Sequence, residues 1–184
     1  MKKLILLIAA ACMFLTGCGY TMQSRANLPF HEIDLGRVEN KTHEPKLEDR
    51  LARAIGSVFP EYGFDISPHA RYRLECDIET FTMTVLSEIG LTAAEYQITT
   101  GVAMRLVETR SGNITVMRPA SPFVTYFRST GRIEAVMAQK ELATDRAMRD
   151  VAQRAAQEII YQKELFAPGQ PSQTAPPQKV QTAQ

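Results

Sequence analysis

Residues 70–85 read ARYRLECDIETFTMTV, and apolar and polar side chains alternate there more regularly than anywhere else in the chain. Successive side chains of a strand point to opposite faces, so the pattern predicts a strand with one buried and one solvated face. The phase of the alternation reverses near Thr80, where a β-bulge or a bend would account for the reversal. The predicted buried face carries Ala70, Tyr72, Leu74, Cys76 and Ile78, followed by Phe81, Met83 and Val85.

The residues before this strand predict a shorter strand and then a helix. The short strand covers residues 30–38, and Asn-Lys-Thr at residues 40–42 begins a turn. The helix should begin near Pro45, because a missing N–H costs nothing at a helix start. Gly63 can supply the left-handed residue that follows a helix end. Apolar residues at helical spacing form its core stripe: Leu47, Leu51, Ile55, Val58 and Phe59.

After the central strand, the pattern predicts a loop at residues 87–92 and a second long strand. One face of that strand carries Tyr96, Ile98, Val102, Met104 and Leu106. Residues 111–113 read as a hairpin turn, and residues 114–117 begin the return strand. Pro119 and Pro122 then interrupt it. Proline cannot donate to a strand ladder, so this stretch should lie at a sheet edge, which residues 123–127 can resume.

The last predicted element is a long helix over residues 139–165, with Met148, Val151, Ala152, Ala155 and Ile159 as its core stripe. The order is therefore strand, helix, a meander of long strands, and helix. This order predicts an α+β fold in which two helices pack on one face of a mainly antiparallel, four-stranded sheet, as a two-layer sandwich. One such domain should cover residues 30–166.

The N-terminus has the features of an export signal. Lys2 and Lys3 precede an apolar run that is too short to span a bilayer, and the run ends in Leu15-Thr16-Gly17-Cys18, which resembles a bacterial lipobox. We therefore expect residues 1–17 to be a lipoprotein signal peptide, Cys18 to be lipidated and residues 18–29 to be a tether. An ordinary secretory signal that ends near a cysteine is the alternative. Gly19, in place of an aspartate that resembles an inner-membrane retention signal, favours the periplasmic face of the outer membrane.

The C-terminal residues and Cys76 allow two further predictions. Residues 167–184 are rich in proline and glutamine and contain no aromatic residue, so we expect a disordered tail. Cys12 would leave with the signal peptide and Cys18 would carry lipid, which leaves Cys76 without a disulfide partner. We expect Cys76 to be a small buried hydrophobic residue rather than a reactive thiol.

The residues give little reason to expect catalysis. His31, His43 and His69 lie on different predicted elements without metal-ligand spacing, and the chain has no glycine-rich phosphate loop. We therefore predict no catalytic residue, no metal and no cofactor. The formal net charge is +1, or −1 once Lys2 and Lys3 are removed, so no basic field draws the protein to nucleic acid.

One charge pattern stands out. Residues 105–132 contain five arginines and a single acid, Glu108. The planar guanidinium group of arginine matches the geometry of a phosphate, so this stretch could form an edge that binds anions. Charge on an edge strand also prevents aggregation between strands, and this second interpretation requires no ligand.

Taken together, several short motifs resemble the LptE family of lipopolysaccharide-assembly lipoproteins, over about residues 18–166. The motifs are Cys18-Gly19-Tyr20, Asn40-x-Thr42-x-x-Pro45, Ala94-Glu95-Tyr96-Gln97, Phe127-Arg128-Ser129 and Ala155-Ala156-Gln157-Glu158-Ile159. The resemblance implies a protein that is not an enzyme. It implies a plug inside the barrel of the outer-membrane translocon LptD, a helper in the assembly of that barrel, and a protein that binds lipopolysaccharide.

The resemblance also suggests where the ligand binds. In the family, basic residues contact the ligand from the loop before the Ala-Glu-Tyr-Gln strand and from the segment that leads into the last helix. Here the loop at residues 87–92 has Glu88 and no base, whereas the second segment has Arg132 and Lys140. We expect Arg128, Arg132 and Lys140 to bind lipopolysaccharide and to converge near one end of the domain. A TolB-like or curli-secretion-type periplasmic binding lipoprotein is an alternative, and an envelope hydrolase is a remote one.

Overall fold

The computed structural model describes residues 28–89, 92–117, 122–129 and 132–162. The predictions for the signal peptide, Cys18, nearly all of the tether and the tail therefore lie outside the described residues. The elements are β1 (Glu32–Asn40), α2 (Leu47–Glu61), β2 (Asp65–Ile66), β3 (Tyr72–Ile89), β4 (Thr92–Glu108), β5 (Ile114–Met117), β6 (Phe123–Arg128) and α3 (Ile133–Tyr161). None of the helices in this part of the chain is long and apolar enough to span a membrane.

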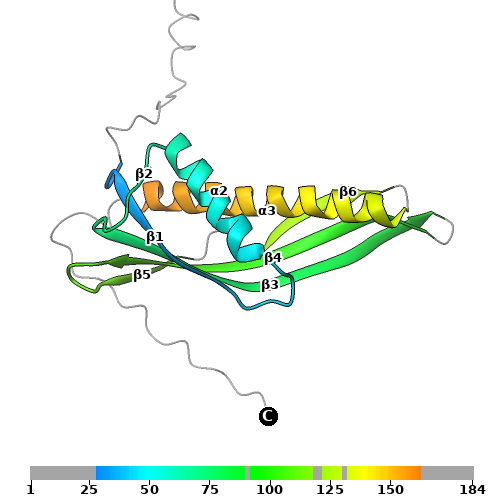
Figure 1. Ribbon diagram of the computed structural model, residues 1–184, viewed down its shortest axis with the longest axis horizontal. Coiled ribbons are helices and arrows are strands. Elements are labelled where there is room, and N and C mark those ends of the chain that lie inside the picture. Colours follow the sequence, from blue (N-terminus) through cyan, green and yellow to red (C-terminus); the bar gives the residue numbers. More distant parts are fainter. Residues whose placement is uncertain (1–27, 90–91, 118–121, 130–131, 163–184) are drawn as a thin grey trace, which may run out of the picture.

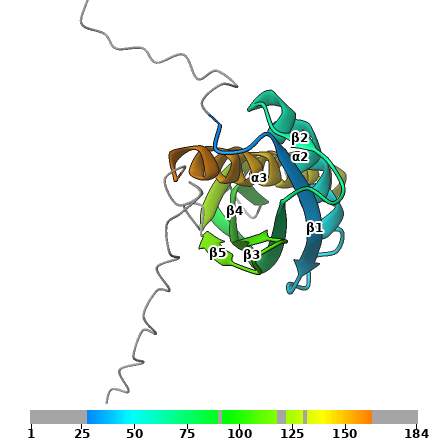
Figure 2. The ribbon, with the colours of Figure 1, turned by 90° about the vertical axis from the view of Figure 1, so that its left-hand side faces the viewer.

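The fold is α+β, as predicted, with both helices on the same side of one sheet (Figures 1 and 2). The sheet has six strands rather than four, in the order β2-β1-β3-β4-β5, and β6 also pairs with β4. The two-residue β2 is additional, and the predicted return strand is divided into β5 and β6, which continue one another along β4. The predicted edge position is therefore confirmed for β5 and β6, whereas residues 118–121 between them lie outside the described residues.

Strand β1 makes the parallel pairs of the sheet. It lies between β2 and β3 and runs parallel to both, because the chain crosses over through α2 before it returns to the sheet. The other pairs, β3–β4, β4–β5 and β4–β6, are antiparallel. The register of β3 against β4 shifts between Ile78 and Thr80, which confirms the bulge inferred from the reversal of the alternation.

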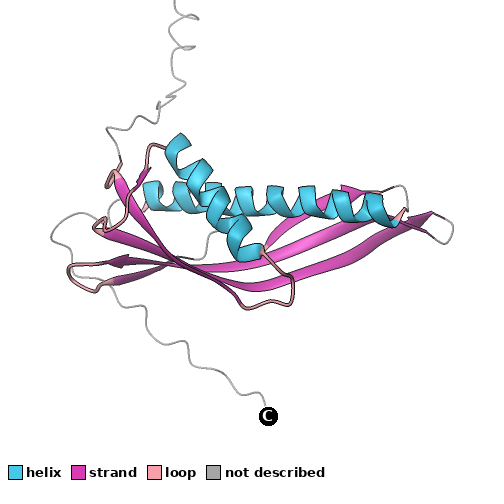
Figure 3. Cartoon of the chain, in the orientation of Figure 1, coloured by secondary structure: helices cyan, strands magenta, loops and turns pink. Residues whose placement is uncertain are grey.

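The two central strands are longer than expected. They stay paired as far as Ile89 and Thr92, so most of the predicted loop at residues 87–92 is strand, and that prediction is wrong. A two-residue connection suffices for antiparallel neighbours, so the polar residues near Gly90 do not require a longer loop. Figure 3 shows that this hairpin reaches beyond the other strands at one end of the molecule.

The core lies between the inner face of the sheet and the two helices. The whole predicted stripe of α2 is fully buried, and Gly63 has a φ of 94°, as expected for the residue after the helix end. Helix α3 starts at Ile133, six positions before the predicted start. Its N-cap residue, Arg132, makes no side-chain capping hydrogen bond, so the sequence contains no capping signal for this start. Its buried face is rich in alanine, and such small side chains allow the helix to approach α2 closely.

Candidate functional site

The end of the molecule where β3 and β4 extend beyond the other strands combines features that could bind a ligand or a partner. Pairing of β1 with β3 stops at Asn40 and Ile78, whereas β3 and β4 remain paired to Ile89 and Thr92. We call residues 79–89 of β3 and 92–100 of β4 the distal hairpin. Strand β6 runs along the β4 side of the distal hairpin, and the first half of α3 lies over it (Figure 1).

The inner face of the distal hairpin is only partly covered. Tyr96 and Phe127 stack with ring centroids 4.8 Å apart and form a small core with Ile98 and Ala143. Met83 and Val85 share this face through their pairing with Ile98 and Tyr96, yet 43% and 45% of their surfaces are exposed. Met83 and Val85 therefore lie on the predicted face, but the prediction that they are buried is wrong, because α3 packs on β4 and β6.

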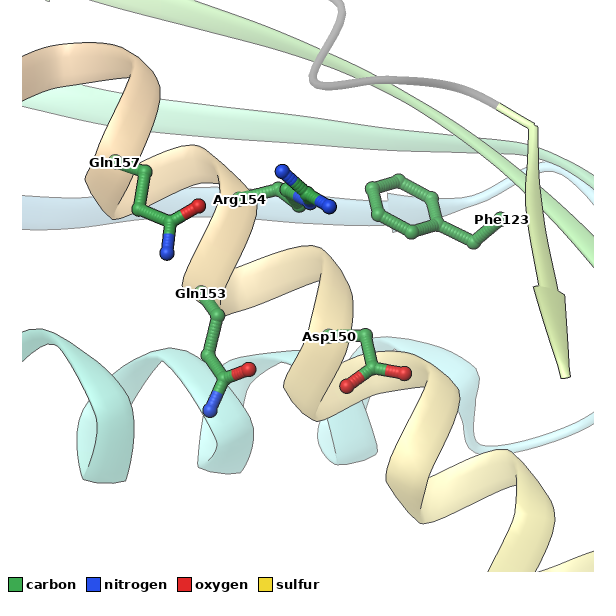
Figure 4. A pocket seen from close by; sticks show the side chains of 5 residues that line it. All are labelled: Phe123, Asp150, Gln153, Arg154 and Gln157. Atoms are coloured by element: carbon green, nitrogen blue, oxygen red, sulfur yellow. The ribbon is translucent and has the colours of Figure 1, made fainter. Parts of the chain in front are cut away.

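A hollow of about 410 Å³ opens at the other half of α3, next to the start of β6 (Figure 4). Phe123 forms one wall, and Asp150, Gln153, Arg154 and Gln157 form the other. No sequence pattern indicates this hollow, because the solvent-exposed face of a helix carries charged and amide residues whether or not they line a depression.

A second hollow, of about 460 Å³, lies where the distal hairpin begins. Lys140 of α3 points into this region: its Nζ donates to Oε2 of Glu44 at 2.8 Å and lies 5.9 Å from the ring centroid of Phe81. The loop from β1 to α2 and the first residues of the distal hairpin supply the other walls, which are Lys41, Thr42, His43, Glu44, Glu79, Thr80, Phe81, Thr82 and Met83.

The Asn-x-Thr motif fixes the loop that borders this hollow. Oδ1 of Asn40 accepts from the backbone N–H of Thr42 at 3.0 Å, and Nδ2 of Asn40 donates to the backbone oxygen of Glu44 at 2.7 Å. The predicted turn is confirmed. Because the motif holds the backbone at Glu44, it positions the carboxylate that meets Lys140.

The three predicted ligand residues are not all in one place. Arg128 ends β6 on its outward-facing side, next to the buried Phe127, and its Nε lies 3.3 Å from Oε1 of Glu95. Arg132 is exposed at the start of α3, close to Arg128 in the chain. Lys140 instead contacts Phe81 on the inner side of the sheet. The structure therefore brings Arg128 and Arg132 to one end of the domain but separates Lys140 from Arg128 across the sheet.

Ion pairs reduce the positive charge of residues 105–132. Arg105 contacts Oδ2 of Asp77 at 3.0 Å and Oε2 of Glu75 at 3.4 Å, and Arg128 pairs with Glu95. Asp77 lies on the face of β3 that was predicted to be solvated, yet it is buried, because Arg105 and Lys41 cover it and bind its carboxylate. Oδ1 of Asp77 has no hydrogen-bond partner in the described part of the chain.

Cys76 lies in the core, as predicted. Burial, reinforced by the carboxylates of Asp77 and Glu75, raises the pKa of its thiol to about 12. The thiolate is the nucleophilic form, so Cys76 is inert at neutral pH. Within the described ranges, no three His, Cys, Asp or Glu side chains gather closely enough to hold a metal ion.

Comparisons with known proteins identify a family and a fold. A family model described as LptE, lipopolysaccharide-assembly, matches residues 30–161. A lipoprotein from Caulobacter crescentus CB15 has 15% identity and a TM-score of 0.50, with 69% of this chain and 90% of that chain covered. A DUF330 protein from Xanthomonas campestris has 11% identity and a TM-score of 0.54, with 77% and 91% covered. These two likenesses show the fold alone. No curated protein sequence is significantly similar to the chain.

Proposed function

Because the chain belongs to the LptE family of lipopolysaccharide-assembly proteins, we propose that it is an outer-membrane lipoprotein that plugs the LptD barrel, assists the assembly of that barrel and binds lipopolysaccharide during its transport to the outer leaflet. The family match carries the proposal, since it spans every element from β1 to α3. The role is one of binding and assembly, without a catalytic step.

The proposed anchor is Cys18. Cleavage of residues 1–17 and acylation of Cys18 would leave residues 18–29 as the tether between the membrane and β1. Each buried CH₂ group contributes about 0.8 kcal/mol, so several acyl chains hold a protein on a membrane almost permanently. The domain would then remain at the periplasmic face of the outer membrane.

The surface of the distal hairpin supports the role of a barrel plug. Barrel interiors of this type are polar, so a plug needs a wettable surface. Thr82, Thr84, Gln97 and Thr99 face outward from the distal hairpin, opposite the inner face that carries Met83 and Ile98. Nearer the middle of the sheet, the same outer face carries Arg73, Glu75 and Arg105.

For lipopolysaccharide, we propose two contact points on either side of the start of α3. Arg128 and Arg132 form the first, at the end of β6, and Lys140 forms the second, in the hollow beside Phe81. Lipid A is a phosphorylated, acylated disaccharide, and guanidinium and ammonium groups bind its phosphates.

The decisive experiment is a purification of the lipidated protein in mild detergent, followed by identification of what co-purifies. We expect a barrel protein of the LptD type and lipopolysaccharide. The matched control is the Cys18→Ser chain, which should recover less of both because it is not anchored. Recovery of a different periplasmic complex without any barrel would contradict the proposed function and favour a TolB-like or curli-secretion-type role.

A further inference from the structure

The β3 side of the distal hairpin is an open sheet edge. Strand β1 pairs with β3 over Asp34–Asn40 and then turns away toward α2; the last backbone contact is the Lys41 N–H to the Ile78 oxygen, at 2.9 Å. Beyond Ile78, no described residue pairs with β3 on that side. Residues 80–88 therefore present unpaired backbone N–H and C=O groups along the edge, and all of these residues except Phe81 are exposed.

This edge lacks the features that normally protect an edge strand. Residues 80–87 read TFTMTVLS, without lysine, proline or any formal charge. β-Branched and aromatic residues favour strands, and a long uncharged edge is a template for strand pairing. The opposite edge differs, because Pro119 and Pro122 lie between the short strands β5 and β6, and Arg128 ends β6.

Exposed apolar side chains border the open edge from two directions. Met83 and Val85 lie on the inner face of the edge strand itself. Ile133 and Met137 of α3, which are 74% and 61% exposed, are seven and three residues before Lys140 and therefore lie on the same stripe of the helix. Lys140 faces Phe81 of β3, so this stripe is turned toward the edge.

The hollow beside Phe81 lies in line with β1. It is bordered by residues 41–44, where the chain leaves the sheet after β1, and by residues 79–83 of the edge strand. A strand added along residues 80–88 would start beside this hollow and continue the position that β1 occupies beside Ile78. Its inward side chains would cover Phe81, Met83 and Val85, and Ile133 and Met137 would close over them.

We propose that residues 80–88 accept an extended segment of the barrel partner as an additional strand. Strand addition obtains affinity from main-chain hydrogen bonds and specificity from alternate side chains. The added segment should be uncharged, with apolar residues toward α3 and small polar residues beside Thr82 and Thr84. That the barrel supplies this segment depends on the proposed function. That the edge is open depends only on the observed strand pairing.

The C-terminal residues of the chain fit this edge less well. They follow the end of α3, which lies at the opposite end of the molecule from the distal hairpin (Figure 1). A helix of this length spans about 43 Å at 1.5 Å per residue. Four prolines between residues 168 and 177 also make the tail a poor strand. Pairing of the edge with a second copy of the chain is a separate outcome, which the experiment below identifies.

Hydrogen exchange of the detergent-purified complex with the barrel tests the proposal directly. We expect amides of residues 80–88 to exchange about tenfold more slowly in the complex than in the chain alone, and residues 123–128 of the opposite edge to change little. Unchanged exchange at residues 80–88 in a complex that retains the barrel would overturn the inference and leave the proposed function intact. Protection that appears without the barrel and grows with chain concentration would also overturn it, in favour of pairing between copies.

A pair of variants provides a second readout. Met83→Lys with Val85→Lys places charges where the added strand must pack, and both positions are exposed, so the fold should tolerate them. Val124→Lys with Tyr126→Lys makes the same change of charge on the opposite edge, at residues that are 43% and 57% exposed. We expect the first variant to retain about tenfold less barrel than the second. Equal retention by the two variants would overturn the inference, and a wild-type chain that retains no barrel would overturn the proposed function with it.

Discussion

Nζ of Lys140 lies 2.8 Å from Oε2 of Glu44, which joins α3 to the loop before α2 across 96 positions of the chain. The side chains of both residues are about a quarter exposed, at 27% and 26%. The ammonium group that we propose as a ligand contact is therefore already balanced by a carboxylate. An incoming phosphate has to compete with Glu44 for it.

Replacement of Glu44 by glutamine should strengthen lipopolysaccharide binding. Glutamine keeps the shape of the side chain but removes its charge, so Lys140 becomes free to meet a phosphate. A partly exposed pair contributes about 0–1 kcal/mol, so we expect a gain in affinity of up to about fivefold, which shrinks at high salt. Titration of the purified chain with lipopolysaccharide at two salt concentrations measures it.

Glu61→Gln is the matched control for this change. Glu61 pairs with Arg149 at 2.7 Å in a different part of the molecule, and its replacement changes the net charge equally. An equal gain from both variants would show that net charge alone is responsible. No gain from Glu44→Gln would remove Lys140 from the proposed contact.

Replacement of Arg128, Arg132 and Lys140 by glutamate should weaken lipopolysaccharide binding strongly and in a salt-dependent way, because it reverses the local field. Single replacements should do little, since exposed contacts contribute only about 0–1 kcal/mol each. Glutamate at position 140 would face Glu44, so a melting curve must accompany the titration. Unchanged affinity in a folded triple variant would reject these residues as the ligand site.

Cys18→Ser should prevent lipidation and cleavage, because a serine hydroxyl is a much weaker nucleophile than a thiolate. Mass spectrometry of the protein from membranes measures both events. We expect an acylated N-terminus at Cys18 in the wild type and an unprocessed chain in the variant. An unmodified N-terminus at another residue would contradict the proposed anchor.

The thiol of Cys76 should resist alkylation in the folded protein. Its pKa is raised to about 12, so it stays protonated at pH 8 and becomes reactive only when the chain unfolds. The same shift predicts a loss of stability as the pH rises from about 9 toward 12, because the unfolded thiol ionises first. Labelling of a chain that begins at Gly19, with and without denaturant, checks this. Rapid labelling of the native chain would show that Cys76 is accessible.

Removal of residues 167–184 should leave the thermal midpoint nearly unchanged, because this proline- and glutamine-rich segment offers little apolar surface to a core. Thermal unfolding of the full and shortened chains measures the difference. A loss of several degrees would mean that the segment docks on the domain.

Burial patterns were the most predictable part of the fold. Leu51 and Ile55 on α2, and Leu74 and Ile78 on β3, occupy the core because helical and strand periodicity each place apolar side chains on one face. The reversal at Thr80 also located the bulge. Periodicity failed for Met83 and Val85, since it indicates the face on which a side chain lies but not whether another element covers that face.

The candidate site was less predictable because its contacts join residues that are distant in the chain. The burial of Asp77 depends on Arg105 from β4 and Lys41 from the end of β1, and only the assembled sheet brings them together. Likewise, Arg128 is separated from Lys140 because it points outward next to the inward-facing Phe127, whereas α3 places Lys140 beside Phe81 on the inner side of the sheet. The start of α3 has no capping signal, so its first turns were predicted as part of the preceding segment, and Lys140, expected at the helix entry, lies well inside the helix.

The difference between the β3 side and the β6 side of the distal hairpin determines how far strand pairing can propagate there. A subunit with two receptive edges can join its neighbours head to tail without limit, and open-ended contacts of this kind build fibres. In the described part of this chain, β5 and β6 are short and proline lies between them, whereas residues 80–88 form one continuous strand. Pairing at residues 80–88 would therefore end with the first partner. The distal hairpin therefore has a valency of one for strand addition, so pairing there produces a closed complex and not an extending fibre.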